Sequence, residues 1–269
     1  MIKPKQSLGQ NFLIDDNITR KIVHSMDPGR EDYVVEVGPG KGALTRFLAE
    51  TAGHVLAVEI DGRLVDNLRA MFSPEQVTIL HRDFLEVSLT ELAAQQHKRI
   101  RLAGNLPYQL TSPILFKAFE ERAAVRDLTI MVQREVARRI TGKPSTKDYG
   151  ILAVLSQAYS IPRYLFTVSP NCFFPKPNVE SAVIRLEFFE APPFQFDEKI
   201  FTLVVKTTFG KRRKTLRNSM QFLPYEPDVI AAILDRIHSE NERMLGQRPE
   251  ELSIEEFAVL AETVKRCIA

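Results

Sequence analysis

The sequence predicts an α/β protein in which a seven-stranded, mostly parallel, doubly wound sheet is followed by a small all-helical domain. Strand-like and helix-like segments alternate between residues 33 and 120, which is the pattern of strand–helix–strand units. Several strand-like segments are continuous apolar runs, as in residues 128–132, and such runs suit parallel strands that are covered on both faces. After a proline-containing segment at residues 190–194, only helical periodicity remains.

The individual elements follow from the spacing of the apolar residues. In residues 43–50, for example, Leu44, Phe47 and Leu48 share one helical face. We expect strands at residues 33–37, 54–60, 77–81, 100–103, 128–132, 164–168 and 182–188. We expect helices at residues 43–50, 63–72, 113–119, 135–140, 151–159, 198–209, 228–238 and 254–267. Ser253 and Glu256 have the spacing of a capping box at the start of the last helix.

These elements predict two domains. Residues 1–190 should form an N-terminal arm and the sheet domain, and residues 191–269 the helical domain. The two cysteines, Cys172 and Cys267, are far apart and lack metal-ligand spacing, so we expect neither a metal site nor a disulfide. The N-terminus has no apolar signal region and no run approaches 18 apolar residues, so we expect a cytoplasmic protein without a membrane span.

A glycine-rich turn follows the first strand of the predicted sheet. It occupies residues 36–42 and includes Gly38 and Gly40. Glycine lets the backbone make a tight turn and lets a ligand approach it closely. The same turn can also join a strand to a helix without binding anything, so the turn alone does not define a site.

Acidic residues follow the next two strands. Glu59 ends the second strand, where a carboxylate accepts hydrogen bonds from ribose hydroxyls in nucleotide-binding sheets of this type. Asp83 follows the third strand and could accept from the amino group of an adenine. Either carboxylate alone could be a helix cap or a solvated charge. NAD is a competing ligand, but the turn has the spacing G-x-G-x-G, whereas the dinucleotide turn is G-x-G-x-x-G.

The fourth strand is followed by Asn105, Leu106, Pro107 and Tyr108, a signature of amino-methyltransferases. An aromatic amine is a poor nucleophile because its lone pair is delocalised into the ring, so a site must orient the amino group toward the electrophile. The Asn105 side-chain oxygen is one acceptor for it, and the carbonyl of Leu106 or of Pro107 is the other. Tyr108 can stack on the base. The electrophile that fits is the sulfonium of S-adenosylmethionine, and a plain N-x-P turn is the alternative.

At this point the sequence resembles the ribosomal RNA adenine dimethyltransferases, and especially the bacterial branch that dimethylates two adjacent adenosines near the 3′ end of small-subunit (16S) rRNA. The resemblance covers nearly the whole chain. The matching stretches are GQNFL at 9–13, VEVGPG at 35–40, AVEID at 57–61, GNLPY at 104–108, QREVA at 133–137, DYG at 148–150, FFPKPNVES at 173–181 and RRKTL at 212–216. It implies the class I S-adenosylmethionine-dependent methyltransferase fold.

The resemblance also implies roles for residues that spacing alone would not assign. Asn11 and Leu13, from the N-terminal arm, would close over the cofactor. The remaining cofactor-binding residues would be Gly38, Gly40, Glu59, Ile60, Asp83, Phe84 and Asn105. Phe173 would hold the target base opposite Tyr108, and Phe174 is the alternative for that role. Without the resemblance, either phenylalanine could be a core aromatic.

Two basic clusters are candidate RNA-binding surfaces. One consists of Lys211, Arg212, Arg213, Lys214 and Arg217, and the other of Arg134, Arg138, Lys143 and Lys147. Such residues can neutralise phosphates, although a run of charges can also be a solvated face. The net charge of only +2 means that any RNA binding relies on these local patches.

The expected partner is small-subunit rRNA within a pre-ribosomal 30S particle, bound by a monomer that needs no protein partner. Two other functions stay open. A relative that methylates a large-subunit rRNA adenosine and confers antibiotic resistance has similar core motifs. A ribosome-assembly factor could use the same fold for binding alone, although the intact residues 105–108 argue against that.

Overall fold

The computed structural model describes residues 3–5 and 8–268 and divides the chain into two compact units. Residues 1–137 and 160–190 belong to the first unit, which contains the sheet. Residues 138–159 and 191–269 belong to the second, which is helical.

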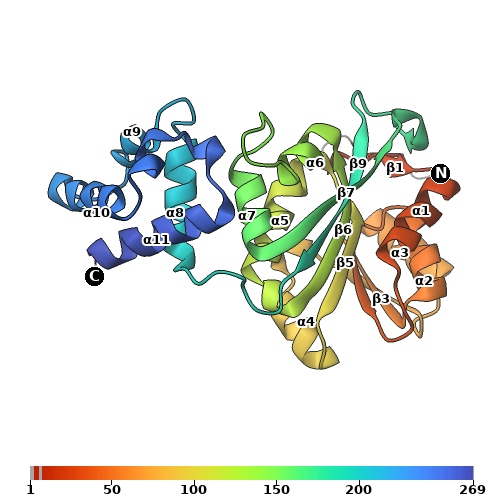
Figure 1. Ribbon diagram of the computed structural model, residues 1–269. Coiled ribbons are helices and arrows are strands. Elements are labelled where there is room, and N and C mark those ends of the chain that lie inside the picture. The colour runs from red at the N-terminus through yellow and green to blue at the C-terminus, as the bar shows by residue number, and fades with distance from the viewer. Residues whose placement is uncertain (1–2, 6–7, 269) are drawn as a thin grey trace. The chain divides into compact units, whose positions relative to one another are not determined.

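The sheet has the predicted seven strands and is mostly parallel (Figure 1). Their order across the sheet is β4 (Val77–His81), β3 (His54–Glu59), β2 (Tyr33–Val37), β5 (Ile100–Asn105), β6 (Val125–Gln133), β9 (Ser181–Phe188) and β7 (Ser160–Val168). The first five strands are parallel, and β9 runs antiparallel to both of its neighbours. The carboxyl ends of β2 to β5 therefore meet at one edge, where such sheets bind ligands.

Helices cover both faces of the sheet (Figure 1). One face carries α1 (Asp16–Met26), α2 (Ala43–Thr51) and α3 (Gly62–Met71), and the other carries α4 (Leu89–Gln96) and α5 (Thr111–Glu120). The short α6 (Arg134–Ile140) follows β6. The prediction missed α1 and α4. At the start of α1, the Asp15 side chain accepts hydrogen bonds from the N–H groups of Asn17 and Ile18, which is an ordinary helix N-cap.

The N-terminal arm pairs with a loop that lies more than 150 residues further along the chain. Strand β1 (Phe12–Leu13) is antiparallel to β8 (Phe173–Phe174), with Phe12 opposite Phe174 and Leu13 opposite Phe173. The Ile14 N–H donates to the Cys172 carbonyl and extends the pairing by one hydrogen bond. Two segments that resembled the family separately in the sequence thus form one small ribbon.

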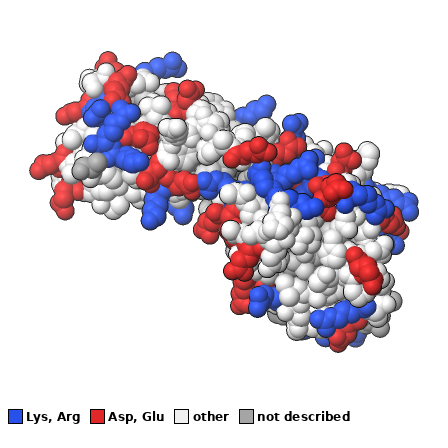
Figure 2. Space-filling model, turned by 90° about the horizontal axis from the view of Figure 1, so that it is seen from below, with Lys and Arg blue, Asp and Glu red and all other residues white. Residues whose placement is uncertain are grey.

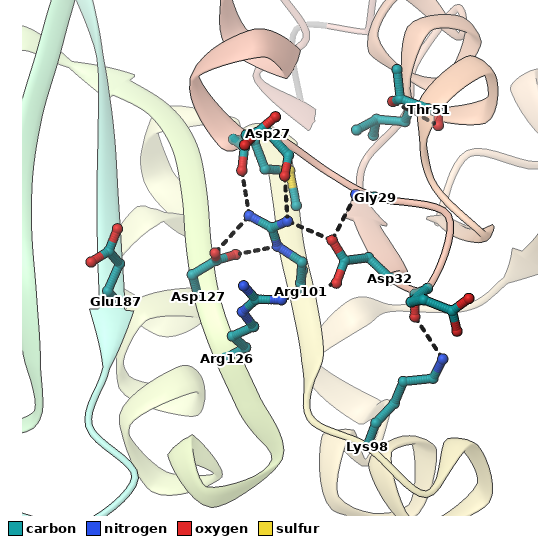
Figure 3. Close-up of polar contacts among 12 residues, drawn as sticks. Asp27, Gly29, Asp32, Thr51, Lys98, Arg101, Arg126, Asp127 and Glu187 are labelled. Carbon is teal, nitrogen blue, oxygen red and sulfur yellow. Dashed lines mark hydrogen bonds and ion pairs between the residues drawn. The ribbon is translucent and has the colours of Figure 1, made fainter.

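A buried arginine organises the opposite edge of the sheet (Figure 3). Arg101 on β5 is 1% exposed and donates to both carboxylate oxygens of Asp127 on β6, at 3.0 and 2.7 Å. It also donates to Asp32 at 2.7 Å and to the main-chain oxygens of Met26 and Asp27, where α1 ends. These bonds satisfy the hydrogen-bond donors of the guanidinium. The Arg101 charge is therefore structural, and it joins segments at the edge remote from the strands' carboxyl ends.

The helical unit consists of α7 (Ile151–Tyr159), α8 (Glu198–Phe209), α9 (Leu216–Met220), α10 (Pro227–Gly246) and α11 (Ile254–Ile268). The predicted capping box opens α11, since Ser253 N–H donates to Glu256 at 2.7 Å and Glu256 N–H donates to Ser253 Oγ at 3.1 Å. Single 3₁₀ turns occur at Phe84–Glu86, Tyr108–Leu110, Arg122–Ala124, Pro170–Cys172 and Pro249–Glu251.

The expected domain boundary differs from these units in one respect. Residues 138–159 were expected in the sheet domain but belong to the helical unit. The reason is local packing, because the buried Tyr149 donates its hydroxyl to the Leu252 carbonyl at 2.8 Å and its ring meets Phe209 at 5.9 Å. Among the described residues, no helix is both long and apolar enough to cross a membrane.

Candidate active site

A cavity of about 220 Å³ opens at the carboxyl ends of β2, β3, β4 and β5. Every residue that the sequence assigned to the cofactor or to the target base lies on its wall. These residues are Asn11, Leu13, Gly38, Gly40, Glu59, Ile60, Asp83, Phe84, Asn105, Leu106, Pro107, Tyr108 and Phe173. The cavity lies within the sheet unit, and the residues come from six separate segments of the chain.

The glycine turn has a backbone that only glycine adopts readily. Gly38 and Gly40 have φ angles of 65° and 60°, in the left-handed region. The Gly38 N–H donates to the Val58 carbonyl at 3.0 Å, which ties the turn to β3. A Cβ atom on Gly40 would lie 3.1 Å from the ring of Phe12. The arm therefore lies directly against the turn, and a larger side chain there would push the two apart.

Glu59 is held rigidly at the end of β3. It is 4% exposed, and its two oxygens accept from the N–H groups of Asp61 at 2.9 Å and Gly40 at 3.0 Å. Burial raises the pKa of Glu59, whereas these two N–H groups act to lower it. Each oxygen keeps a further lone pair, so the carboxylate can accept hydrogen bonds from a ligand.

A second carboxyl group, Glu36 on β2, also lines the cavity and had been given no role from the sequence. It is 2% exposed, and its Oε2 atom has no hydrogen-bond partner among the described residues. Burial raises the pKa of Glu36 to about 8, and the neighbouring charge of Glu59 adds to the shift. The sequence did hold a signal, because an acidic residue stands inside an otherwise apolar buried strand.

Asp83 follows β4, and of the two roles that the sequence left open the structure shows that of a cap. One of its oxygens accepts from the Leu85 N–H at 2.9 Å and caps the 3₁₀ turn Phe84–Glu86. Asp83 also lies on the cavity wall and is only half-buried, so the rest of the carboxylate remains accessible to a ligand. Phe84 beside it is buried.

The arm reaches the cavity through the main chain of Asn11. The Asn105 side chain donates through Nδ2 to the Asn11 carbonyl at 2.9 Å, and Asn11 itself donates through Nδ2 to the Gly9 carbonyl at 3.3 Å. Gln10 adds a hydrogen bond of 3.1 Å to Asp61 at the start of α3. These bonds hold the arm across the edge of the cavity.

Residues 105–108 present two acceptors and one aromatic ring. Because Nδ2 of Asn105 is bound to Asn11, the amide oxygen is the group left for a ligand. The Pro107 carbonyl accepts from the Leu110 N–H at 2.9 Å, whereas the Leu106 carbonyl accepts no hydrogen bond within the described part of the chain. Tyr108 is fixed by a hydrogen bond of 2.9 Å between its hydroxyl and Ser181 Oγ, and burial raises its pKa.

The two adjacent phenylalanines point to different places. Phe173 is 4% exposed and lies on the cavity wall, whereas Phe174 is 55% exposed and is not part of the wall. Alternation of side chains along β8 explains this difference. Of the two alternatives, Phe173 is the one placed to contact a base in this cavity.

Most of the predicted RNA-binding residues lie in the helical unit. These are Arg138, Lys143, Lys147, Lys211, Arg212, Arg213, Lys214 and Arg217. Arg212 joins their two sequence segments, because it pairs with Glu250 and donates to the carbonyls of Thr146 at 3.1 Å and Lys147 at 2.9 Å. Arg212 is therefore a structural link, while its neighbour Arg213 is exposed.

The remaining predicted basic residue, Arg134, belongs to the sheet unit and pairs with Glu180. Figure 2 shows Lys and Arg beside Asp and Glu over much of one face, so positive charge is gathered locally and does not form a continuous field. Lys211 and Lys214 lie over the ring of the exposed Phe222, at 4.4 and 5.2 Å from its centroid. Within residues 3–5 and 8–268, no three His, Cys, Asp or Glu side chains are grouped as metal ligands.

Comparisons with known proteins agree with this geometry. Residues 1–262 match the family model described as ribosomal RNA adenine dimethylase. The chain is 45% identical over 264 residues to the "ribosomal RNA small subunit methyltransferase A" of Chlorobium phaeobacteroides, which covers 98% of this chain and 92% of that protein. It is 41% identical over 270 residues to the protein of the same name from Alkaliphilus oremlandii, covering 98% of this chain and 93% of the relative.

Two solved structures share the fold along nearly the whole chain. A dimethyladenosine transferase from Plasmodium falciparum has a TM-score of 0.81 at 21% identity, covering 95% of this chain and 98% of its own. The 23S rRNA methyltransferase ErmE has a TM-score of 0.70 at 26% identity, covering 95% of this chain and 100% of its own.

Proposed function

The chain belongs to the ribosomal RNA adenine dimethylase family, and we propose that it transfers methyl groups to the exocyclic N6 of two adjacent adenosines near the 3′ end of small-subunit rRNA. One observation carries this proposal: Asn105, Leu106, Tyr108 and Phe173 face the same cavity as the glycine turn and Glu59. The proposed site for the target base and the proposed site for the cofactor thus lie in one cavity.

The cavity has the donors and acceptors that S-adenosylmethionine requires. Glu59 and Asp83 are carboxylates with free lone pairs at the ends of β3 and β4, and they suit ribose hydroxyls and an adenine amino group. Gly38 and Gly40 let the ligand approach the backbone. Ile60 is 49% exposed and Phe84 is buried, and both offer apolar contact on the same wall. When bound, the cofactor supplies a methyl group on a sulfonium, which is already an activated electrophile.

The protein's own task is to orient the amine. The Asn105 amide oxygen accepts one N–H of the adenine amino group, and the Leu106 carbonyl accepts the other. We choose Leu106 over Pro107 because the Pro107 carbonyl already accepts from Leu110. With both hydrogens held, the lone pair of N6 is directed toward the methyl group of the sulfonium. Orientation of this kind contributes a large part of the rate of methyl transfer.

Two aromatic rings complete the site for the base. Tyr108, fixed through Ser181, and Phe173, fixed in β8, stack on the faces of an adenine that has left its helix. After the first transfer, N6 still has one hydrogen to donate, so a second transfer is geometrically possible. The dimethylated product has no N–H left, which weakens its hold on Asn105 and Leu106.

Small-subunit RNA is favoured over large-subunit RNA as the substrate. The relatives that are 41–45% identical over 98% of the chain carry a small-subunit name, whereas the large-subunit enzyme ErmE is only 26% identical. We place the reaction in the cytoplasm, on a pre-ribosomal 30S particle, with the protein acting as a monomer. The helical unit supplies the contact to RNA through the exposed Lys143, Lys147, Arg213 and Arg217.

Mass spectrometry of rRNA nucleosides tests the proposal. Small subunits that lack the modification are incubated with the protein and methyl-labelled cofactor, with large subunits as the comparison and Asn105→Ala as the inactive variant. We expect labelled N6,N6-dimethyladenosine in the small-subunit RNA only, and none with the variant. Label in large-subunit RNA alone would assign the chain to the other branch, and no label in either would leave it as a binding factor.

A further inference from the structure

Glu36 presents a carboxyl group to the cavity, and no main-chain N–H within the described structure donates to it. Its side chain is 2% exposed, lines the cavity, and has an Oε2 atom with no partner among the described residues. A buried polar group without a partner is uncommon, and a charge in that position is costlier still. The carboxyl group is therefore expected to be neutral unless a positive charge comes next to it.

The contrast with Glu59 shows that burial alone does not create this situation. Glu59 is also buried, yet its oxygens accept from the N–H groups of Gly40 and Asp61. Donors of this kind stabilise the charged form of a carboxyl group. Asp83, the third carboxyl group on the cavity wall, likewise accepts from the Leu85 N–H. Within the described structure, Glu59 and Asp83 therefore have main-chain donors, whereas Glu36 has none.

The surroundings of Glu36 leave room for a ligand group. Lys41 and Arg82 line the same cavity, but neither is among the groups that shift the pKa of Glu36. On the flanking strands its register partners are Ala57 of β3 and Ala103 of β5, both small. The charged group that acts on it is Glu59, and Thr45 of α2 is close enough to lower the pKa without a hydrogen bond of normal geometry. The wall of the same cavity includes the apolar residues Ile22, Leu44 and Leu13.

We infer that Glu36 is a proton-linked counter-ion of the cofactor, neutral in the free protein and ionised when the positive charge of S-adenosylmethionine lies next to it. This inference rests on the proposed function, because it takes the cofactor to be a cation. The exchange balances: the carboxyl O–H bond breaks, its proton passes to solvent, and the carboxylate pairs with the ligand. The raised pKa of Glu36, about 8, agrees with a group that holds its proton at neutral pH.

Titration calorimetry with S-adenosylmethionine measures the proton directly. The wild type is titrated at pH 6.5 in several buffers of different ionisation enthalpy, and the slope of the observed enthalpy gives the number of protons released. At this pH the cofactor's α-amino group is already protonated, so it does not contribute. We expect release of about one proton and an affinity that rises roughly tenfold per pH unit between pH 6 and 7.5.

Glu36→Gln is the matched variant, because it keeps the shape and the neutral state of the side chain but has no proton to release. We expect it to bind the cofactor more weakly, with no proton release and no pH dependence over this range. Wild-type binding without proton release would overturn the inference and leave the proposed function intact. Failure of the wild type to bind S-adenosylmethionine would overturn both. If the variant does not fold, the wild-type slope decides alone.

The demethylated product, S-adenosylhomocysteine, identifies which charge Glu36 meets. This product keeps the ammonium group and has lost the sulfonium charge. Equal proton release with both ligands places Glu36 beside the ammonium group, and release with S-adenosylmethionine only places it beside the sulfonium. Either result upholds a proton-linked counter-ion, whereas release that persists unchanged in Glu36→Gln would assign the proton to another group and overturn it.

Discussion

The side chain of Asn105 donates a hydrogen bond of 2.9 Å to the main-chain oxygen of Asn11, which lies 94 residues earlier in the chain. This one bond fixes the amide so that its oxygen is the group available to a substrate. It also attaches the N-terminal arm to the turn that follows β5. In the proposed mechanism, orientation of the amine and attachment of the N-terminal arm therefore depend on the same side chain.

Asn105→Asp should remove both effects. The carboxylate has no N–H for the Asn11 carbonyl and places negative charge against that oxygen. We expect methyl transfer to fall by about 100-fold or more, since misplacement of a reacting group has costs of this size. We also expect the melting temperature to fall by a few degrees. Asn11→Ala is the control, because it keeps the accepting main-chain oxygen and should leave the melting temperature near that of the wild type.

Glu59→Gln should weaken cofactor binding while sparing RNA binding. The Gln amide has one oxygen for the two N–H groups of Gly40 and Asp61, and its NH₂ group would face one of these donors. We expect at least a roughly tenfold rise in the Kd for S-adenosylmethionine by calorimetry. Filter binding to small-subunit RNA should be unchanged, and an equal loss in both assays would mean that Glu59 serves folding instead.

Phe173 and Phe174 form a matched pair for testing the base site. Phe173→Leu removes a ring from the cavity wall, and stacking of a base on an aromatic ring contributes about 1–3 kcal/mol. We expect kcat/KM to fall roughly 5- to 150-fold on small subunits, with cofactor affinity preserved. Phe174→Leu changes an exposed ring outside the wall and should cost little. Equal activity of the two variants would remove Phe173 from the site.

Charge reversal at Arg213 should weaken RNA binding and reduce its salt dependence. Arg213 is exposed, and each phosphate contact adds to the slope of log affinity against log salt. Lys199→Glu, near the start of α8 and away from the basic cluster that follows this helix, makes the same charge change as a control. Arg212 is unsuitable for this test because its reversal would place a carboxylate against Glu250 and disturb the fold. If the slope of log affinity against log salt for Arg213→Glu equals that of the control, the basic cluster around Arg213 does not bind RNA.

Glu36 should make the free energy of unfolding depend on pH. Its pKa is about 8 in the folded protein and near 4.5 when unfolded, so the folded state holds the extra proton between these values. The contribution of Glu36 to the free energy of unfolding is therefore fully present below about pH 4.5, and it is lost as the pH rises through 8. Glu36→Gln should abolish this decline, so its melting temperature should exceed that of the wild type at pH 9 and match it near pH 5. Parallel curves for the two proteins would refute the assignment.

The sequence predicted those parts of the fold that depend on local patterns. Apolar runs predicted the seven main strands. The motifs at 36–42 and 105–108 correctly predicted that the cavity lies at the carboxyl ends of the strands. The helix α1 was not predicted, although Asp15 before it is a typical N-cap. The capping box at Ser253 was predicted and is present because it involves only residues three apart.

Long-range relationships could not be predicted in this way. Nothing local in the sequence pairs Leu13 with Phe173 or places Tyr149 against Leu252 in the helical unit. The choice of the Leu106 carbonyl over that of Pro107 depends on a turn hydrogen bond, which only the backbone geometry reveals. Glu36 was visible as an acidic residue in an apolar strand, but its unpartnered oxygen appears only when its neighbours are in place.

The pairing of Leu13 with Phe173 has a consequence for the integrity of the site. The segment that covers one side of the cavity and the segment that carries the Phe173 ring are the two strands of one antiparallel ribbon. Among the described residues, β1 is the strand that pairs with β8, so displacement of β1 would leave β8 without a strand partner. Deletion of the chain's first dozen residues would thus weaken the support of the Phe173 ring, which lies 160 positions further along the chain.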